Sequence, residues 1–188
     1  MILSELRPLA AEDLEEAAKL AATAFLANPS YGYIFDELCD DGDLLEALTW
    51  LFTRNIGLRL NAGKCAFDEE SGKMVCFFML QFPNSGEISL WSMIMSGLLT
   101  LPFMYGWASY FRLLEIKEYH KNLDRSIKEK VGKKYVMLER MVVSPEYQGQ
   151  GIGQKCLAAG LKAAADAGLG MILSTLSDGN IAFYSKLG

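Results

Sequence analysis

The chain has 188 residues, a length that suits one domain with at most one sizeable insertion. Hydrophobic residues make up 51% of it and charged residues 22%, which excludes disordered, collagen-like and disulfide-stapled proteins and allows a large core. The formal net charge of −5 gives no overall attraction for a phosphate backbone, so we expect no nucleic-acid partner.

The cysteine and histidine content argues against a metal site. Four widely spaced cysteines form no C-x-x-C pair and are accompanied by a single histidine, His120. The first nine residues lack an apolar segment behind a basic stretch, since Glu5 and Arg7 interrupt it. We therefore expect a cytoplasmic protein with reduced thiols and no metal ion.

The charges are unevenly placed along the chain. Residues 1–72 carry 14 acidic and 5 basic side chains, whereas residues 112–134 carry 8 basic and 4 acidic ones. The acidic part could favour a cationic substrate, but charged helix faces in contact with water are the simpler explanation.

The N-terminal third is predicted to form one strand and two helices. An apolar start, residues 2–6, predicts a strand that ends at Arg7-Pro8. Apolar residues at helical spacing predict a helix over 11–27, which Asn28-Pro29 should stop, and a second helix over 43–61.

The middle of the chain is predicted to form a hairpin followed by helices. Strands at 64–67 and 73–82 make the hairpin, and the second is apolar enough to be buried on both faces. A run without a single charge follows, from Ile88 to Phe111, and then a charged helical stretch over 112–130.

The uncharged run has two interpretations. Its length, about two dozen residues, is enough to span a bilayer. Gly97, Pro102 and Gly106 interrupt it, together with several hydroxyl side chains, which favours two short helices with a break near Pro102 over a membrane span. Its aromatic and methionine side chains would then line an apolar acceptor site or complete the core.

The C-terminal part is predicted to alternate strands and helices. Residues 135–143 and 171–175 have the apolar character of strands, 151–167 form an alanine-rich helix, and 180–187 form a short last helix. This alternation indicates an α/β or α+β fold.

The most informative stretch runs from Leu138 to Gly153, where a strand enters a glycine-rich turn that opens directly into a helix. Backbone N–H groups and the positive end of a helix converge there, which is typical of a phosphate or pyrophosphate site. The spacing misses the third glycine of the dinucleotide fingerprint G-x-G-x-x-G, and the terminal Gly-Lys-Ser/Thr of the P-loop is absent. The alternative is a tight turn that binds nothing.

Two sequence elements in the right order carry a family resemblance. Gln148, Gly151 and Gly153 match the signature Q/R-x-x-G-x-G/A after a strand that ends in V-x-P. Residues 180–188 look like the element N-x-x-x-x-F-Y-x-x-x-G in a slightly shorter form. In both of these elements, the chain resembles the GNAT superfamily of acetyl-CoA-dependent N-acetyltransferases.

The resemblance implies a fold and an activity. The fold would be a single domain, 1–188, with a mixed central sheet flanked by helices and a helical insertion at about 84–134 before the cofactor-binding strand. The activity would be transfer of an acetyl group from acetyl-CoA to an amine, with the insertion shaping the acceptor pocket. The alternatives are a non-catalytic acyl-CoA binding or sensing module of the same fold and a protein anchored in a membrane by residues 88–111.

The same resemblance implies how the protein contacts the cofactor. The main chain of the strand would pair with the pantetheine amides, the N–H groups of the glycine loop would hold the pyrophosphate, Asn180 would contact the cofactor, and Tyr184 would lie near its sulfur. The residues implied for the strand are Met141, Val142 and Val143, and those for the loop are Gln148, Gly149, Gln150, Gly151, Ile152 and Gly153.

Direct attack of an amine on the thioester, in a ternary complex, needs a proton acceptor and a proton donor. Glu139 is the predicted acceptor, because it lies on the cofactor strand among mostly apolar residues, and Tyr184 is the predicted donor to the CoA thiolate. N–H groups near Val142 would polarise the carbonyl. The alternatives are a salt bridge for Glu139 and core packing for Tyr184, while we expect His120 to be inert and Cys156 to pack.

The end of the sequence departs from the family pattern. Members of the family continue past the last motif with one or two strands, whereas this chain stops at Gly188. We expect either that the sequence is trimmed or that another segment completes the sheet. A bare apolar edge would invite association, so a homodimer is a further expectation, and the identity of the amine acceptor stays open.

Overall fold

The computed structural model describes residues 2–38, 40–86, 89–132, 134–175 and 178–185. Of the residues that bound the predicted elements, Ile88, Leu187 and Gly188 lie outside these ranges.

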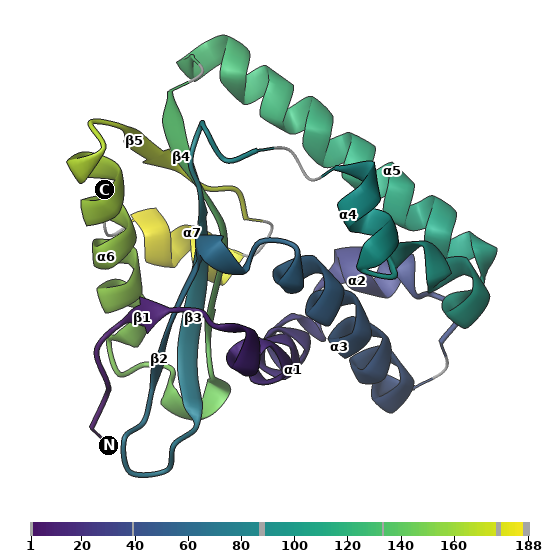
Figure 1. Cartoon of the computed structure of the whole chain (residues 1–188), viewed down its shortest axis with the longest axis horizontal. Helices are drawn as coiled ribbons and strands as arrows, with labels where there is room; N and C mark the ends of the chain where they lie inside the picture. The colour runs from purple at the N-terminus through teal and green to yellow at the C-terminus, as the bar shows by residue number, and fades with distance from the viewer. Residues whose placement is uncertain (1, 39, 87–88, 133, 176–177, 186–188) are drawn as a thin grey trace.

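Five strands form one mixed sheet in the order β1-β2-β3-β4-β5, with helices on both faces (Figure 1). The first four strands pair antiparallel, and β4 pairs with β5 in parallel. The strands are β1 Arg7–Pro8, β2 Gly63–Phe67, β3 Met74–Gln81, β4 Tyr135–Val143 and β5 Gly170–Ile172. This architecture confirms the predicted α+β fold with a mixed central sheet.

The N-terminal strand begins later than the sequence predicts. Residues 2–6 make isolated contacts beside β2, and regular pairing starts only at Arg7. On this side of β2, Phe67 N donates to the Ser4 hydroxyl (2.9 Å) instead of a main-chain oxygen. The apolar pattern of the segment is therefore present without the regular ladder that would make it a strand.

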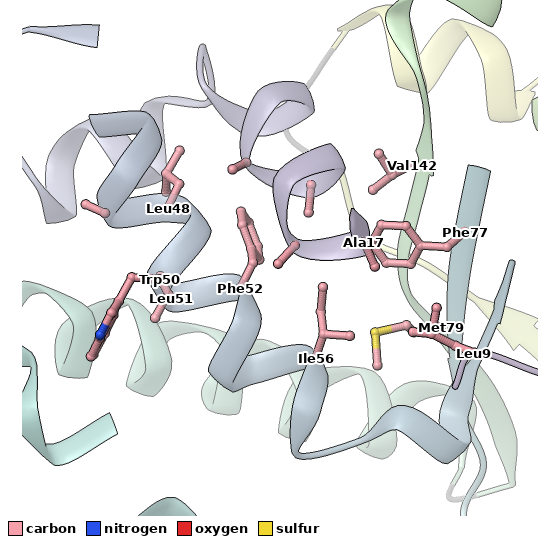
Figure 2. Close-up of a cluster of buried hydrophobic side chains, with 14 of the residues drawn as sticks. Leu9, Ala17, Leu48, Trp50, Leu51, Phe52, Ile56, Phe77, Met79 and Val142 are labelled. Carbon is pink, nitrogen blue, oxygen red and sulfur yellow. The ribbon is translucent and has the colours of Figure 1, made fainter. Parts of the chain in front are cut away.

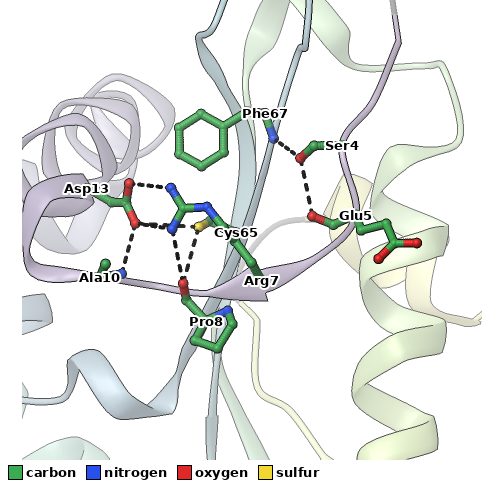
Figure 3. Close-up of polar contacts among 8 residues, drawn as sticks. All are labelled: Ser4, Glu5, Arg7, Pro8, Ala10, Asp13, Cys65 and Phe67. Carbon is green, nitrogen blue, oxygen red and sulfur yellow. Dashed lines mark hydrogen bonds and ion pairs between the residues drawn. The ribbon is translucent and has the colours of Figure 1, made fainter.

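An ion pair fixes this edge of the sheet to the first helical segment (Figure 3). Arg7 donates from Nη1 and Nη2 to the two carboxylate oxygens of Asp13, each at 2.7 Å, and Ala10 N donates to the same carboxylate at 2.8 Å. Asp13 is buried, and the hydrogen bonds from Arg7 hold its pKa below the usual range. The pair ties β1 to the short 3₁₀ turn Ala11–Asp13 that precedes α1.

Helices α1 (Leu14–Phe25) and α3 (Asp41–Gly57) cover one face of the sheet. Four alanines of α1 are fully buried, which lets the backbone of α3 approach closely: Ala17, Ala18, Ala21 and Ala22. Larger side chains of α3, including Phe52 and Ile56, fill the space between the helices and the strands (Figure 2). The second helix ends at Gly57, four residues before its predicted end, because residues 60–62 form a separate 3₁₀ turn.

A short helix missing from the prediction follows α1. Asn28-Pro29 stops α1 as predicted and at once starts α2 (Pro29–Ile34). The Asn28 side chain accepts a hydrogen bond from Ser30 N at 2.9 Å, and Pro29 occupies the first turn, where its missing N–H is not needed.

The opposite face of the sheet is covered by α6 (Ile152–Asp166). Side chains of β3 alternate between the two faces, so that Phe77 and Met79 join the core under α1 and α3, while Cys76 and Phe78 join the core under α6. The prediction that this strand is buried on both faces is confirmed. Cys156 of α6 packs beside Cys76, with 3.2 Å between the sulfurs.

The insertion before β4 is helical, as predicted, but its break lies elsewhere. It consists of α4 (Leu90–Met95), a 3₁₀ turn (Leu98–Thr100) and the long helix α5 (Leu101–Val131). Pro102 sits in the first turn of α5, where proline is tolerated, and the chain turns instead at Gly97 (φ 78°) and kinks at Gly106 (φ 85°). No helix in the described part of the chain has both the length and the apolar character needed to cross a membrane.

Candidate active site

The candidate site lies where β4 and β5 separate. The two strands pair only between Tyr135–Met137 and Gly170–Ile172, because β5 ends three residues before its predicted end at Thr175. Beyond Met137, β4 continues to Val143 with no strand beside it on this side among the described residues. Its outward-facing main-chain groups there can pair with another molecule.

The register decides which main-chain groups face this open edge. Ser144 N donates to Val75 O of β3 at 2.8 Å. Successive residues of an antiparallel strand alternate sides, so the N–H and C=O of Val142 face β3, and those of Met141 and Val143 face the open edge. The carbonyl of Val143 accepts a bond from Gln148 Nε2 at 3.2 Å, which agrees with this assignment.

The glycine loop joins the end of β4 to the start of α6. Gly149 (φ 77°) and Gly151 (φ 79°) both adopt left-handed conformations, which glycine takes without strain. Open space lies where a Cβ of Gly149 would be. Gly151 is the N-cap of the 15-residue helix α6, so the first N–H groups of that helix point into the loop without helical partners. A loop of this shape at the N-terminus of a helix is typical of an anion site.

Gly153 has a different role from the two loop glycines. A Cβ there would lie 3.3 Å from Cζ of Phe183 and 3.9 Å from the methyl of Met141. Phe183 belongs to the last helix, α7 (Asp178–Ser185). Glycine at this position lets α7 pack against the first turn of α6 beside β4, so the two sequence elements that carry the family resemblance meet in space.

Helix α7 also carries Asn180 and Tyr184. Tyr184 is half-buried against its neighbour Phe183, with 5.2 Å between the ring centroids, and burial raises the pKa of its hydroxyl. Asn180 is exposed and donates from Nδ2 to Thr175 Oγ1 at 3.2 Å. Tyr184 is therefore protonated at neutral pH and able to donate a proton.

Glu139 occupies a β-bulge on β4. Leu80 of β3 pairs with Leu138 and Met79 pairs with Arg140, so Glu139 is an extra residue without a partner on β3. Its side chain keeps 25% of its exposure and receives a bond from Arg59 Nη1 at 2.9 Å. An ion pair therefore holds the predicted proton acceptor.

The residues around the bulge come from distant parts of the sequence. Arg140 donates from Nη2 to Asn55 Oδ1 at 3.2 Å, and its guanidinium lies 5.0 Å from the centre of the Phe52 ring. Tyr31 of α2 is half-buried against Phe52, and burial raises the pKa of its hydroxyl. No local motif marks these residues, since Arg59 and Glu139 are 80 positions apart. Sequence reasoning found Glu139 but missed Arg59, Asn55 and Tyr31 as its surroundings.

A cleft of about 550 Å³ opens beside Arg59. Its described walls are partly apolar, with Leu58, Leu80 and Phe82, and its charged lining residues are Arg59 and Lys64. Arg59 therefore lines this cleft and also contacts Glu139. His120, in contrast, is exposed on α5 and contacts the ring of Tyr119.

Comparisons with known proteins agree with this geometry. The family model described as an acetyltransferase (GNAT) domain matches residues 117–188. Among solved structures, the chain is similar to a histone acetyltransferase HPA2 and related acetyltransferase from Corynebacterium glutamicum, with a TM-score of 0.64 and 17% identity over 100% of this chain and 84% of that one.

Two further solved structures are similar. Arylalkylamine N-acetyltransferase 2 from Aedes aegypti has a TM-score of 0.62 and 14% identity over 100% of this chain and 82% of that one. A PaiA N-acetyltransferase from Thermoplasma acidophilum, solved in complex with coenzyme A, has a TM-score of 0.53 and 16% identity over 100% of this chain and 89% of that one. No curated protein matches the chain in sequence.

Proposed function

We propose that this chain is a cytoplasmic, single-domain N-acetyltransferase, because its residues 117–188 match the model of an acetyltransferase (GNAT) domain and its fold is similar to that of solved acetyltransferases. It transfers the acetyl group of acetyl-CoA to an amine by direct attack in a ternary complex. The observation that carries the proposal is the open main-chain edge of β4, which leads directly into a glycine loop at the N-terminus of α6.

The donor site is built mainly from main-chain groups. Met141 presents its N–H and C=O groups and Val143 its N–H group to the pantetheine arm, and the N–H groups from Gln148 to Gly153 surround the pyrophosphate. The open space at Gly149 fits a bulky anion close to the backbone. Asn180 contacts the cofactor from α7. Acetyl-CoA supplies the thioester that the amine attacks.

The chemistry needs three contributions from the protein. Glu139 accepts the ammonium proton of the acceptor, which frees the nitrogen lone pair to form the new C–N bond. An N–H group of the open edge, at Met141 or Val143, polarises the carbonyl, since the register turns the N–H of Val142 towards β3. Tyr184 donates its proton to the thiolate as the C–S bond breaks.

One observation favours a second function, an acyl-CoA binding module without catalysis. Glu139 is already engaged by Arg59 at 2.9 Å, so its carboxylate is held by another group in this structure. The proposed enzyme needs this pair to leave one carboxylate oxygen available, whereas a binding module does not need Glu139 at all.

An acceptor screen separates the two functions. The protein is incubated with acetyl-CoA and a panel of amines that contains arylalkylamines, polyamines, amino sugars and a lysine-rich peptide, and free CoA thiol is measured. Amine-dependent thiol release supports the enzyme. Acetyl-CoA binding by calorimetry without thiol release for any amine supports the binding module, and absence of binding contradicts both.

A further inference from the structure

We propose that Arg59 is a positioning residue for Glu139, and this inference rests on the proposed function. Arg59 reaches the bulge of β4 from the segment between α3 and β2, and it makes the described ion contact of Glu139. Its described hydrogen bonds and ion pair do not reach the glycine loop or the described part of α7, so its effect on acetyl transfer passes through the carboxylate.

The bulge explains why Glu139 needs such a contact. A paired strand residue has its side-chain direction set by the ladder, whereas a bulged residue does not have a partner opposite it. Glu139 lies between the paired residues Leu138 and Arg140 and has no partner on β3. Without a second contact, its carboxylate would sample several rotamers.

The backbone of Arg59 is itself well fixed. Arg59 N donates to Ile56 O at 2.9 Å, and Arg59 O accepts from Ala62 N at 2.9 Å. Its side chain keeps only 19% of its exposure. A guanidinium carried by a backbone that is fixed in this way can hold a carboxylate in one place.

The contact leaves Glu139 able to accept a proton. The described bond joins Nη1 of Arg59 to Oε1 of Glu139, and among the described residues Oε2 has no hydrogen-bond partner. Oε2 is therefore the atom that takes the ammonium proton. The cleft of about 550 Å³ beside Arg59 gives its side chain room to adjust as the acceptor enters.

The surroundings of Glu139 leave Arg59 as its described charged partner. The other titratable groups packed around this part of β4 are Arg140, which is turned towards Asn55, and Tyr31, which lies beside Arg140. Arg59 is the cation in direct contact with the carboxylate.

The test compares Arg59→Met, Arg59→Lys, Glu139→Gln and the double variant Arg59→Met/Glu139→Gln. Methionine keeps most of the apolar stem, and lysine keeps the charge. The control is Lys19→Met, which removes an exposed ion pair to Glu15 on α1, far along the chain from this site. The readouts are kcat, the KM for acetyl-CoA, the pH dependence of kcat and thermal unfolding, with an amine found by the acceptor screen.

We expect Arg59→Met to lower kcat about tenfold at neutral pH without changing the KM for acetyl-CoA. Arg59→Lys should restore most of the rate, and the double variant should be no slower than Glu139→Gln. A wild-type kcat in folded Arg59→Met, beside an impaired Glu139→Gln, overturns this proposal and leaves the proposed function standing. If Arg59→Met does not fold, Arg59→Lys decides. A rate close to that of the wild type supports positioning by the charge, and a rate as low as that of Glu139→Gln contradicts it. Thiol release that is absent for every amine overturns both proposals.

Discussion

The two faces of the sheet offer different chemistry to the same strand, β4. On the α6 side, the site consists of main-chain groups: the open edge of β4, the glycine loop and the first turn of α6. On the α3 side, it consists of charged side chains, with Glu139 held by Arg59 and Arg140 held by Asn55. In the proposed enzyme, the main-chain groups would bind acetyl-CoA, and the charged side chains would contact the amine acceptor.

This difference teaches how each half should respond to mutation. A site of main-chain groups is insensitive to most side-chain changes but sensitive wherever a substitution needs a left-handed conformation or fills the space of the ligand. A site of side chains responds to single substitutions and to pH. The predictions below test this division, from the largest expected effect to the smallest.

The largest effect is expected at the glycine loop. Gly151→Glu adds a strained side chain and a negative charge to the proposed pyrophosphate site, so acetyl-CoA binding should weaken well over tenfold, by about 10². Isothermal calorimetry measures the affinity.

A matched control exists at the other end of the same helix. Gly168 also has a positive φ (67°) and open space around its Cβ position, so Gly168→Glu introduces the same charge and a similar strain away from the loop. Unchanged affinity in folded Gly151→Glu, or equal losses in the two variants, would contradict the assignment of the loop.

The next effect is expected at Tyr184. Tyr184→Phe keeps the ring beside Phe183 and removes only the hydroxyl, so kcat should fall by about 10² or somewhat less while the affinity for acetyl-CoA changes little. Phe183→Leu is the packing control, because it removes ring contacts and leaves the hydroxyl in place. If Tyr184→Phe turns over at the wild-type rate, Tyr184 is a packing residue.

A smaller and pH-dependent effect is expected at Glu139. Glu139→Gln is nearly isosteric and removes the proton acceptor, so the rate should fall about tenfold or more at neutral pH, where most of the amine is protonated. It should partly recover as the pH approaches the pKa of the amine, because the free amine then comes from solution. A variant with the wild-type rate and pH profile would show that Glu139 is structural.

The same division explains what the sequence could and could not predict. The loop side of the site lies within one contiguous stretch, Leu138 to Gly153, so strand, turn and helix are recognisable from local pattern. The contacts of Glu139 depend on a bulge and on a partner 80 positions away, and neither leaves a local signal. The packing of Gly153 against Phe183 is a distant contact of the same kind.

The fold, too, was predictable where the local pattern of residues decides an element, and not where distant contacts decide it. The strand β4 and the helix α6 follow their apolar periodicity closely. The break in the insertion was placed wrongly at Pro102, because a proline in the first turn of a helix starts the helix instead of ending it. The length of β5 depends on where it separates from β4, which is a property of the sheet and not of the five residues predicted for it.

The smallest effect on activity is expected at an ion pair that belongs to neither face of the site. Asp13→Asn removes the charge that receives two bonds from Arg7 at 2.7 Å, so the free energy of unfolding should fall by about 1–2 kcal/mol, a discounted value because the side chain of Arg7 is 43% exposed. The acetyl-CoA affinity and kcat should be unchanged, because this pair fixes the edge strand β1 and not β4.

The pH dependence of stability gives the sign of this contribution. The pKa of Asp13 is lower in the folded state than in the unfolded chain, so the stabilisation is present above the unfolded value, about 3.9, and is lost as the pH falls through the folded value. Urea unfolding curves of the two proteins should therefore differ by the full amount at pH 7 and converge under acid conditions. A constant difference down to the lowest pH at which both proteins fold would show that Asp13 stabilises the edge by packing and not by its charge, and a change in kcat would show that the edge strand is coupled to the site.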